Sequence, residues 1–424
     1  MTRSRFLFFL ASTVLVLPIL AGSIVGAAVD EPIAPGGDSL YKFLSVFTET
    51  LGLVDQTYVE ETDRDTLMSA ALDGVTDALD PLAVYVPEEA VPGYLEARAV
   101  GTAHSGLYLL RERGMIYVLA VREGSPAERA GVEDGDLIAE VDGRSTRIMP
   151  LWEVQQLLAG APGTALELKL VRFAETRDAT LTLGSFEVPA PALEEREGVP
   201  VMTLAGIEAS TPAQVRALLE RLSGADRLLL DLRGAAGGDV AAAYEIAGIF
   251  TGGELGRLQR RGDAPLESYT GDGPAWSGRI AVLTDRATLG PAEVLATVLR
   301  QRAGAELVGQ RTFGYAGRQS MLELSSGAVV FLADAFYTGP DLEPLDEPLE
   351  PDVRVEPRLR PFAAVEDGEE DGDGEEGGES EPDAEGEAPA GDEAGGDDGA
   401  DEERPDAVLE KGLEILRQPA EKAA

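Results

Sequence analysis

The sequence predicts a mixed α/β protein built from several parts, and three patterns along its 424 residues lead to this prediction. From 187 to 357, apolar strand segments alternate with helical segments, which is typical of a parallel sheet covered by helices. From 100 to 173, short strands are separated by glycine-rich turns. From 40 to 99, apolar residues recur at helical spacing. We therefore expect a helical N-terminal region, a small strand-rich domain and an α/β core.

Composition excludes several kinds of site. The chain has no cysteine, which removes disulfides, thiolate catalysis and cysteine-bound zinc. It has one histidine, His104, so a metal site that needs two imidazoles is excluded. The net charge of −42 argues against nucleic-acid binding, because neutralising phosphates requires clustered Lys and Arg. We expect no metal and no cofactor.

Residues 1–30 predict an export signal or an uncleaved membrane anchor. Arg3 and Arg5 precede an apolar run from Phe6 to about Val29, and small residues near its end are typical of a cleavage site. The run is also long enough to span a bilayer. Both alternatives place the rest of the chain in the cell envelope, periplasmic or exported, with an inner-membrane anchor if the leader is retained.

The C-terminal part contains an acidic stretch and one more helix. About half of the residues from 362 to 405 are Asp or Glu, a composition typical of a disordered linker. An alternative is a tail that binds divalent cations or a basic partner. An amphipathic helix is predicted at 406–418, with Leu409, Leu413 and Leu416 on one side.

The strand-rich domain resembles a PDZ domain. Its diagnostic segment, 124–143, reads GSPAERAGVEDGDLIAEVDG: a small helix, a Gly-Asp-Leu-Ile strand start and an Asp-Gly turn. The resemblance implies that a bound peptide is added as an extra strand. It also implies that a C-terminal carboxylate is received by the backbone of one loop, formed by Ser105, Gly106, Leu107 and Tyr108. His104, beside this loop, is either an ordinary polar residue or a peptide contact.

The order of parts resembles the carboxyl-terminal processing peptidases, or tail-specific proteases. These are serine–lysine endopeptidases that place a PDZ domain before an α/β catalytic core. The stretches that match the family include ALDP (78–81), LLLDLRGAAGG (228–238), VLTDRATLGPAEVLATVLRQ (282–301), TFGYAGRQ (312–319) and DAVLEKGLEIL (406–416).

The same resemblance shows both catalytic positions to be degenerate. It places the nucleophilic serine three residues before Glu293, where this chain has Gly290. It places the general base, a lysine four residues before Gln319, at Tyr315. Glycine has no group that can attack a carbonyl, and a tyrosine with a pKa near 10 is a poor base at neutral pH. We expect Glu293 and Gln319 to lie in the cleft of the core.

A glycine-rich loop of the family is partly retained. Gly237 and Gly238 correspond to backbone beside the oxyanion, whereas Ala235 and Ala236 replace the family's asparagine and proline. The backbone N–H groups could receive a carbonyl oxygen. The alternative is a glycine-rich turn kept for close packing. A nucleotide loop is disfavoured, because neither glycine-rich nucleotide motif is present.

These observations predict an exported pseudopeptidase that binds polypeptide C-termini or unfolded clients. It could also regulate an active processing peptidase by forming a mixed oligomer with it. A homo-oligomer is a further expectation. Two alternatives stay open. The first is an active serine-type endopeptidase with an unusual nucleophile such as Thr288 or Ser320. The second is a scaffold in which the PDZ domain and the acidic tail carry all partner binding.

Overall fold

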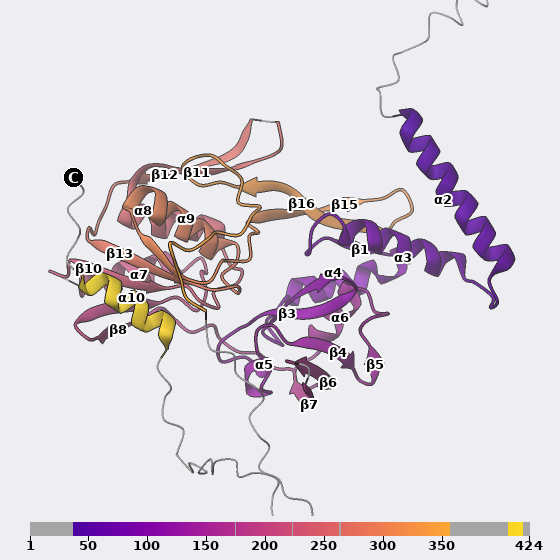
Figure 1. The fold of residues 1–424 in the computed structure, drawn as a ribbon, viewed down its shortest axis with the longest axis horizontal. Coiled ribbons are helices and arrows are strands. Elements are labelled where there is room, and N and C mark those ends of the chain that lie inside the picture. The colour runs from indigo at the N-terminus through magenta and orange to yellow at the C-terminus, as the bar shows by residue number, and fades with distance from the viewer. Residues whose placement is uncertain (1–36, 174, 223, 263, 357–405, 419–424) are drawn as a thin grey trace, which may run out of the picture. The chain divides into compact units, whose positions relative to one another are not determined.

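The computed structural model describes residues 37–356, except 174, 223 and 263, and residues 406–418. The predicted leader and the acidic stretch therefore lie outside the described residues. The chain divides into two compact units, Met1–Ala71 and Leu72–Ala424 (Figure 1). Within the described ranges, no helix is both long and apolar enough to cross a membrane.

The described part of the first unit is helical. It contains α2 (Gly37–Thr57) and the start of α3 (Arg64–Asp77). The carboxylate of Asp63 accepts hydrogen bonds from the first backbone N–H groups of α3, which caps the helix. Large apolar side chains of α2, Tyr41 and Phe43 among them, are exposed.

The second unit opens with a short mixed segment. Within the region predicted to be helical lies a three-residue strand, β1, which helical spacing did not predict. It pairs antiparallel with β16 (Val329–Tyr337), so that the start of this unit joins the end of the core. The segment consists of β1 (Val84–Val86), η1 (Glu88–Ala90) and α4 (Val91–Val100).

An antiparallel sheet follows, with strand order β2-β3-β4-β6-β7, and β5 pairs with β4. The helix α6 begins after Pro150, and its buried residues Leu151, Val154 and Leu158 recur at helical spacing, so one face packs into the domain core. The elements are β2 (Leu107–Glu112), β3 (Met115–Val121), α5 (Pro126–Arg129), β4 (Leu137–Val141), β5 (Arg144–Ser145), α6 (Leu151–Leu158), β6 (Ala165–Arg172) and β7 (Glu175–Thr182).

The core contains a six-stranded sheet with strand order β17-β14-β13-β10-β9-β8, in which only β8 runs antiparallel to its neighbour. This confirms the predicted α/β class. The strands are β8 (Ala192–Arg196), β9 (Val199–Thr203), β10 (Arg227–Asp231), β13 (Arg279–Thr284), β14 (Glu306–Gly309) and β17 (Val353–Arg354).

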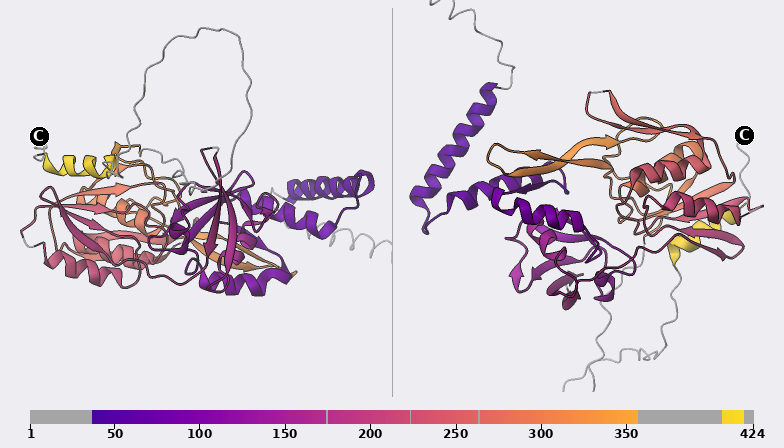
Figure 2. Two further views of the ribbon diagram at one scale, coloured as in Figure 1. Left: turned by 90° about the horizontal axis from the view of Figure 1, so that it is seen from below. Right: turned by 180° about the vertical axis from the view of Figure 1, so that it is seen from behind.

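Helices cover both faces of this sheet, because successive strand residues point to opposite sides. Leu228 and Leu230 pack with α7, α8 and α9, whereas Leu229 packs with α10. Figures 1 and 2 show α10, in yellow, against the sheet on the side away from α8 and α9. The helices are α7 (Thr211–Glu220), α8 (Val240–Phe250), α9 (Pro291–Ala303) and α10 (Ala407–Arg417).

Gly412 explains how closely α10 approaches the sheet. A Cβ atom at this position would lie 2.8 Å from side-chain carbons of both Leu229 and Leu283. A glycine inside a helix weakens it locally. Here its missing side chain permits close packing between helix and sheet.

A second antiparallel sheet was not expected from the strand–helix alternation of the core. Its strand order is β1-β16-β11-β12, and β15 also pairs with β16. The alternation failed here because β12 and much of β15 are exposed and polar, so they lack the apolar runs by which strands were identified. The further strands are β11 (Gly252–Gln259), β12 (Pro265–Asp272) and β15 (Gly317–Glu323).

The packing of α10 leads to a stability prediction. Leu413→Ala should lower the free energy of unfolding by about 2–5 kcal/mol, because Leu413 is 4% exposed and its loss leaves a cavity against the sheet. The partly buried Leu409 on the same helix is the matched control, and Leu409→Ala should cost clearly less. Urea unfolding of both variants measures the difference. Equal losses would contradict the placement of α10.

Candidate functional site

The glycine-rich loop connects β10 to α8, and Asp239 caps that helix by accepting hydrogen bonds from Ala241 and Ala242 N–H. Gly237 and Gly238 have φ angles of +66° and +111°, which L side chains rarely adopt. A Cβ at Gly238 would lie 2.2 Å from the carbonyl oxygen of Ile207. Close packing therefore requires glycine here, whether or not the N–H groups also bind a ligand.

Gly237 lies directly against the strand-rich domain. A Cβ at this residue would lie 2.1 Å from the hydroxyl oxygen of Tyr108, on β2. Arg122, after β3, donates to the carboxylate of Glu208 at 3.2 Å and to the carbonyl of Ala236 at 3.1 Å. Its guanidinium also lies 5.6 Å from the centre of the Tyr108 ring. The two domains thus meet at the glycine-rich loop.

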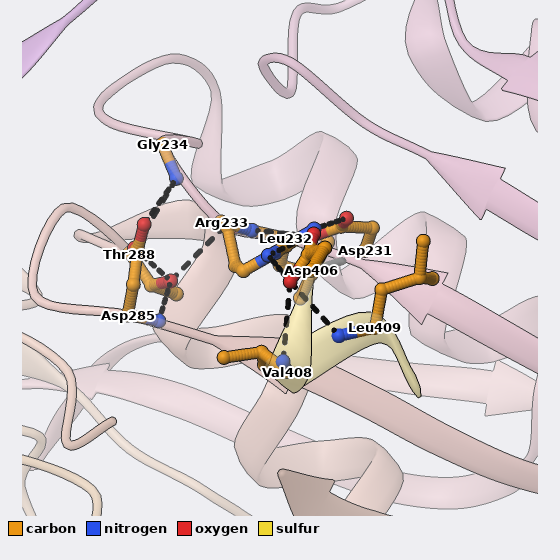
Figure 3. Close-up of polar contacts among 9 residues, drawn as sticks. All are labelled: Asp231, Leu232, Arg233, Gly234, Asp285, Thr288, Asp406, Val408 and Leu409. Carbon is orange, nitrogen blue, oxygen red and sulfur yellow. Dashed lines mark hydrogen bonds and ion pairs between the residues drawn. The ribbon is translucent and has the colours of Figure 1, made fainter. Parts of the chain in front are cut away.

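The second loop of the site follows β13 and contains Thr288 (Figure 3). The Thr288 side chain is fully buried, and its hydroxyl oxygen lies 3.0 Å from both the Leu232 carbonyl and an Asp285 carboxylate oxygen. The same oxygen accepts a hydrogen bond from the Asp285 N–H. Asp285 also accepts from the Gly234 N–H, which joins this loop to the glycine-rich one. The polar groups of Thr288 are therefore used in holding the two loops together.

Figure 3 also shows how the C-terminal helix is attached to this network. Arg233 donates to Asp231 at 2.6 Å and pairs with Asp406, the N-cap of α10, at 2.8 Å. Burial opposes the charge on Arg233, but the neighbouring carboxylates outweigh burial and raise its pKa. Asp406 accepts hydrogen bonds from the backbone of Val408 and Leu409.

Gly290 ends the second loop and precedes α9, which begins at Pro291 as predicted. Gly290 has φ +65° and ψ −109°, a conformation that favours glycine. A Cβ here would meet nothing closer than the Tyr315 carbonyl oxygen, at 3.9 Å. A Cβ atom would therefore fit in the space available. A residue larger than glycine would instead be strained by the positive φ angle.

Glu293 joins Gly290 to the loop that carries Tyr315. Its carboxylate accepts hydrogen bonds from the N–H of Gly290 at 3.0 Å, Gly314 at 2.6 Å and Tyr315 at 3.0 Å, and from the Thr312 hydroxyl at 2.5 Å. The side chain is 1% exposed. Burial raises the pKa of Glu293, and the four hydrogen bonds act against that shift. The backbones of Gly290 and Tyr315 are therefore held in place by one carboxylate.

Tyr315 is the residue that the family resemblance placed at the position of the general base. Its ring packs edge-on against Phe336, with ring centres 5.7 Å apart. The residue is 7% exposed, and its buried hydroxyl lies near Asp80 and Gln319 but makes no hydrogen bond of good geometry with any described residue. Burial, together with the charge of Asp80, raises the pKa of Tyr315. The phenol is therefore protonated at neutral pH.

A cavity of about 650 Å³ brings most of the predicted site residues together. It extends from the groove beside β2 and α6 to the loops of the core, a size typical of ligand pockets. The predicted residues that line it are Ser105, Leu107, Tyr108, Gly237, Gly238, Gly290, Tyr315 and Gln319. Glu293 and Gly106 are not among the residues that line it. His104 is not part of it, and its Nδ1 lies 2.8 Å from the Gly160 carbonyl oxygen.

Part of the predicted carboxylate loop is engaged internally. The Gly106 N–H donates to the Thr102 carbonyl at 2.7 Å, and the Leu107 N–H donates to the Ser105 hydroxyl at 3.3 Å. Gly106 has a φ of +83°, and a Cβ there would collide with the Ser125 side chain. These hydrogen bonds shape the start of β2.

Sequence reasoning missed several residues of the cavity. Arg98, from α4, donates to Gln319 Oε1 at 3.0 Å, and Gln319 Nε2 donates to the Leu82 carbonyl at 2.6 Å. Leu289 also lines the cavity. No local pattern marks these residues, because each reaches the site through contacts between distant segments. In the described part of the chain, no group of three or more His, Asp or Glu side chains is arranged to hold a metal ion.

Comparisons with known proteins cover both domains. Residues 198–355 match peptidase family S41, and residues 117–172 match a PDZ domain. A probable CtpA-like serine protease of Staphylococcus aureus (strain COL) is 24% identical over 346 residues, which cover 80% of this chain and 70% of the relative. A probable CtpA-like serine protease of Staphylococcus haemolyticus is 23% identical over 295 residues, 68% of this chain and 60% of the relative.

A solved structure shows the same fold. The photosystem II D1 C-terminal processing protease is 24% identical and has a TM-score of 0.58, covering 72% of this chain and 86% of its own. The sequence matches and the structural likeness both extend across the antiparallel domain and the α/β core.

The position of Glu293 leads to the second stability prediction. Glu293→Gln replaces one acceptor oxygen by an NH₂ group, which would face buried N–H donors and leave them unpaired. We expect a loss of about 2–4 kcal/mol in the free energy of unfolding. Glu245→Gln, at an exposed position on α8, should change stability by less than about 0.5 kcal/mol. Chemical unfolding tests this, and equal effects of the two substitutions would refute the role assigned to Glu293.

Proposed function

This chain belongs to the family of PDZ-containing carboxyl-terminal processing peptidases, and we propose that it binds polypeptide C-termini without cleaving them. The observation on which the proposal depends is the pair of residues at the former reaction centre. Gly290 and Tyr315 face one cavity and provide neither a nucleophile nor a base. The carboxylate of Glu293 holds the backbone of the surrounding loops in place.

The core contains no other lysine that could replace the lost one. The chain contains no lysine between Lys169 and Lys411, and Lys169 pairs with Glu140 on the antiparallel sheet at 2.9 Å. Arginine does not deprotonate in proteins. The raised pKa of Tyr315 keeps its hydroxyl neutral, so it can donate a hydrogen bond but cannot remove a proton at neutral pH.

The two hydroxyls considered as substitute nucleophiles are poorly placed for attack. Thr288 is fully buried and its hydroxyl is bound by neighbouring backbone and carboxylate groups. Ser320, on β15, does not line the cavity and instead interacts with the Asp334 carboxylate. Both hydroxyls are engaged by carboxylates outside the cavity lining, which argues against an active peptidase.

Peptide binding is supported by the edge strand of the antiparallel sheet. β2 pairs with β3 on one side, and its other side lies toward α6 and the cavity. PDZ domains bind peptides by adding a strand at such an edge. A client would then be held beside the former cleft rather than cut there. In the scaffold alternative the core is inert. That alternative gives no role to the cavity that residues of both domains line, so the cavity favours peptide binding.

We further propose that the protein acts in the cell envelope. The proposal rests on the charged and apolar pattern of residues 1–30 in the sequence. In that compartment it would present clients to an active processing peptidase or regulate one.

The absence of peptidase activity is directly testable. The purified full chain should neither degrade an unfolded protein such as casein nor react with a fluorophosphonate serine probe. Thr288→Ala is the control for weak labelling by the probe. Labelling that does not depend on the Thr288 hydroxyl should persist in this variant. Labelling above background that disappears in Thr288→Ala would establish an active enzyme and reject the proposal.

Peptide recognition requires a separate measurement. A dodecapeptide with apolar C-terminal residues should bind the full chain saturably in isothermal titration calorimetry. The same peptide with an amidated C-terminus should bind at least about tenfold more weakly, because a charge-assisted hydrogen bond to the carboxylate is lost. Equal affinities would show that the carboxylate is not recognised.

A further inference from the structure

Arg98 is the one charged residue among the described residues that line the cavity. All other lining residues are uncharged, although the whole chain carries a net charge of −42. Asp80 acts on the nearby Tyr315, but it is not part of the lining. A chain with a large excess of carboxylates therefore presents one positive charge, and no negative one, in the described lining of this cavity.

The guanidinium of Arg98 is held in place by contacts from distant segments. Its Nη2 donates to Oε1 of Gln319 at 3.0 Å, and Gln319 is itself fixed because its Nε2 donates to the Leu82 carbonyl at 2.6 Å. The guanidinium lies over the Phe331 ring, 4.4 Å from the ring centre. Burial raises the pKa of Tyr94, and the neighbouring guanidinium opposes that shift. The cation is therefore positioned before any ligand binds, which lowers the cost of binding one.

Arg98 lacks the carboxylate partner that other arginines near the same domain have. Arg111 pairs with Asp77. Arg122 pairs with Glu208. Arg98 forms no ion pair with any carboxylate of the described chain, and its side-chain hydrogen bond goes to a neutral amide. Because a guanidinium stays charged and has five N–H donors, it can bind a carboxylate that a ligand supplies.

The place of Arg98 favours a side-chain carboxylate over the terminal one. Gln319 belongs to the core strand β15, so its bond to Arg98 puts the guanidinium on the core side of the cavity. The terminal carboxylate is expected at the loop 105–108, where β2 begins. A client added to this edge strand would reach the core side with the residues that precede its terminus. An Asp or Glu among those residues would then meet Arg98.

We propose that Arg98 selects clients that carry an acidic side chain upstream of the bound C-terminus, by a charge-assisted hydrogen bond to that carboxylate. The inference rests on the proposed peptide-binding function and names the class of client: a polypeptide with an apolar C-terminus preceded by Asp or Glu. The net charge of the chain does not oppose this, because charges farther away than about 8 Å are largely screened at physiological ionic strength.

Three dodecapeptides that differ only in charge test the proposal, titrated into the full chain by calorimetry at physiological salt. The first is Ser-Ala-Ser-Ala-Ser-Ala-Glu-Glu-Ala-Ala-Leu-Val, and the others carry Gln-Gln or Lys-Lys in place of Glu-Glu. Successive residues of an extended chain point to opposite sides, so one residue of each pair can face Arg98. We expect the Glu peptide to bind about three- to tenfold more tightly than the Gln peptide, and the Lys peptide to bind most weakly.

Arg98→Gln should raise the Kd of the Glu peptide to that of the Gln peptide. The Kd of the Gln peptide itself should not change, whereas a structural defect would weaken binding of all three peptides and so contradict the proposal. The matched control is Arg147→Gln, which removes the same charge from an exposed arginine of the antiparallel domain outside the cavity lining. This control should keep the preference for Glu.

Equal affinities of the parent protein for the Glu and Gln peptides overturn the inference, as does a preference for the Lys peptide. A Glu peptide with an amidated C-terminus tests the other source of a carboxylate. If Arg98→Gln removes the difference between free and amidated termini, and not the difference between Glu and Gln, Arg98 binds the terminal carboxylate and the inference is rejected. If the parent binds none of these peptides, the proposed function itself fails.

Discussion

The buried carboxylate of Glu293 is the interaction on which the core side of the cavity depends. It accepts hydrogen bonds from backbone N–H groups of Gly290, Gly314 and Tyr315, so it fixes the path of two loops without using the side chains at 290 and 315. Because backbone atoms make these bonds, the Tyr315 side chain takes no part in fixing the loops, whereas the φ of +65° at position 290 favours glycine.

Residues of the core loops form part of a packed boundary between the two domains. Ala236, Leu289 and Tyr315 cluster with Leu119 and Ala120 of β3, so apolar side chains of both domains meet there. Arg122 adds polar contacts at the same boundary through Glu208 and the Ala236 carbonyl. Hydrophobic burial and this ion pair hold the antiparallel domain over the core. The groove beside β2 and α6 and the loops of the core consequently line one cavity.

The part of the fold that the sequence predicted correctly is the part with strong local patterns. The strand at 227–231 and the helix that begins at Pro291 follow from an apolar run and from proline at the first helical position. The predicted family and the mixed α/β class are confirmed by the matches to both domains. The sheet of β11, β12, β15 and β16 was missed, because its exposed strands carry polar residues and are stabilised by pairing with distant segments.

The sequence by itself determined which chemical groups are absent: residue 290 has no side chain, residue 315 is not a lysine, and no lysine lies between 169 and 411. These facts depend only on residue identity and on alignment of short motifs. Only the tertiary structure decided the state of the groups that remain. It showed that the Thr288 hydroxyl forms hydrogen bonds in a buried network, that the Tyr315 side chain is buried against Phe336, and that Arg98 reaches Gln319. Such outcomes depend on packing between segments that are distant in sequence, 56 residues for Thr288 and Leu232 and 221 for Arg98 and Gln319, and local sequence does not encode the distance between them.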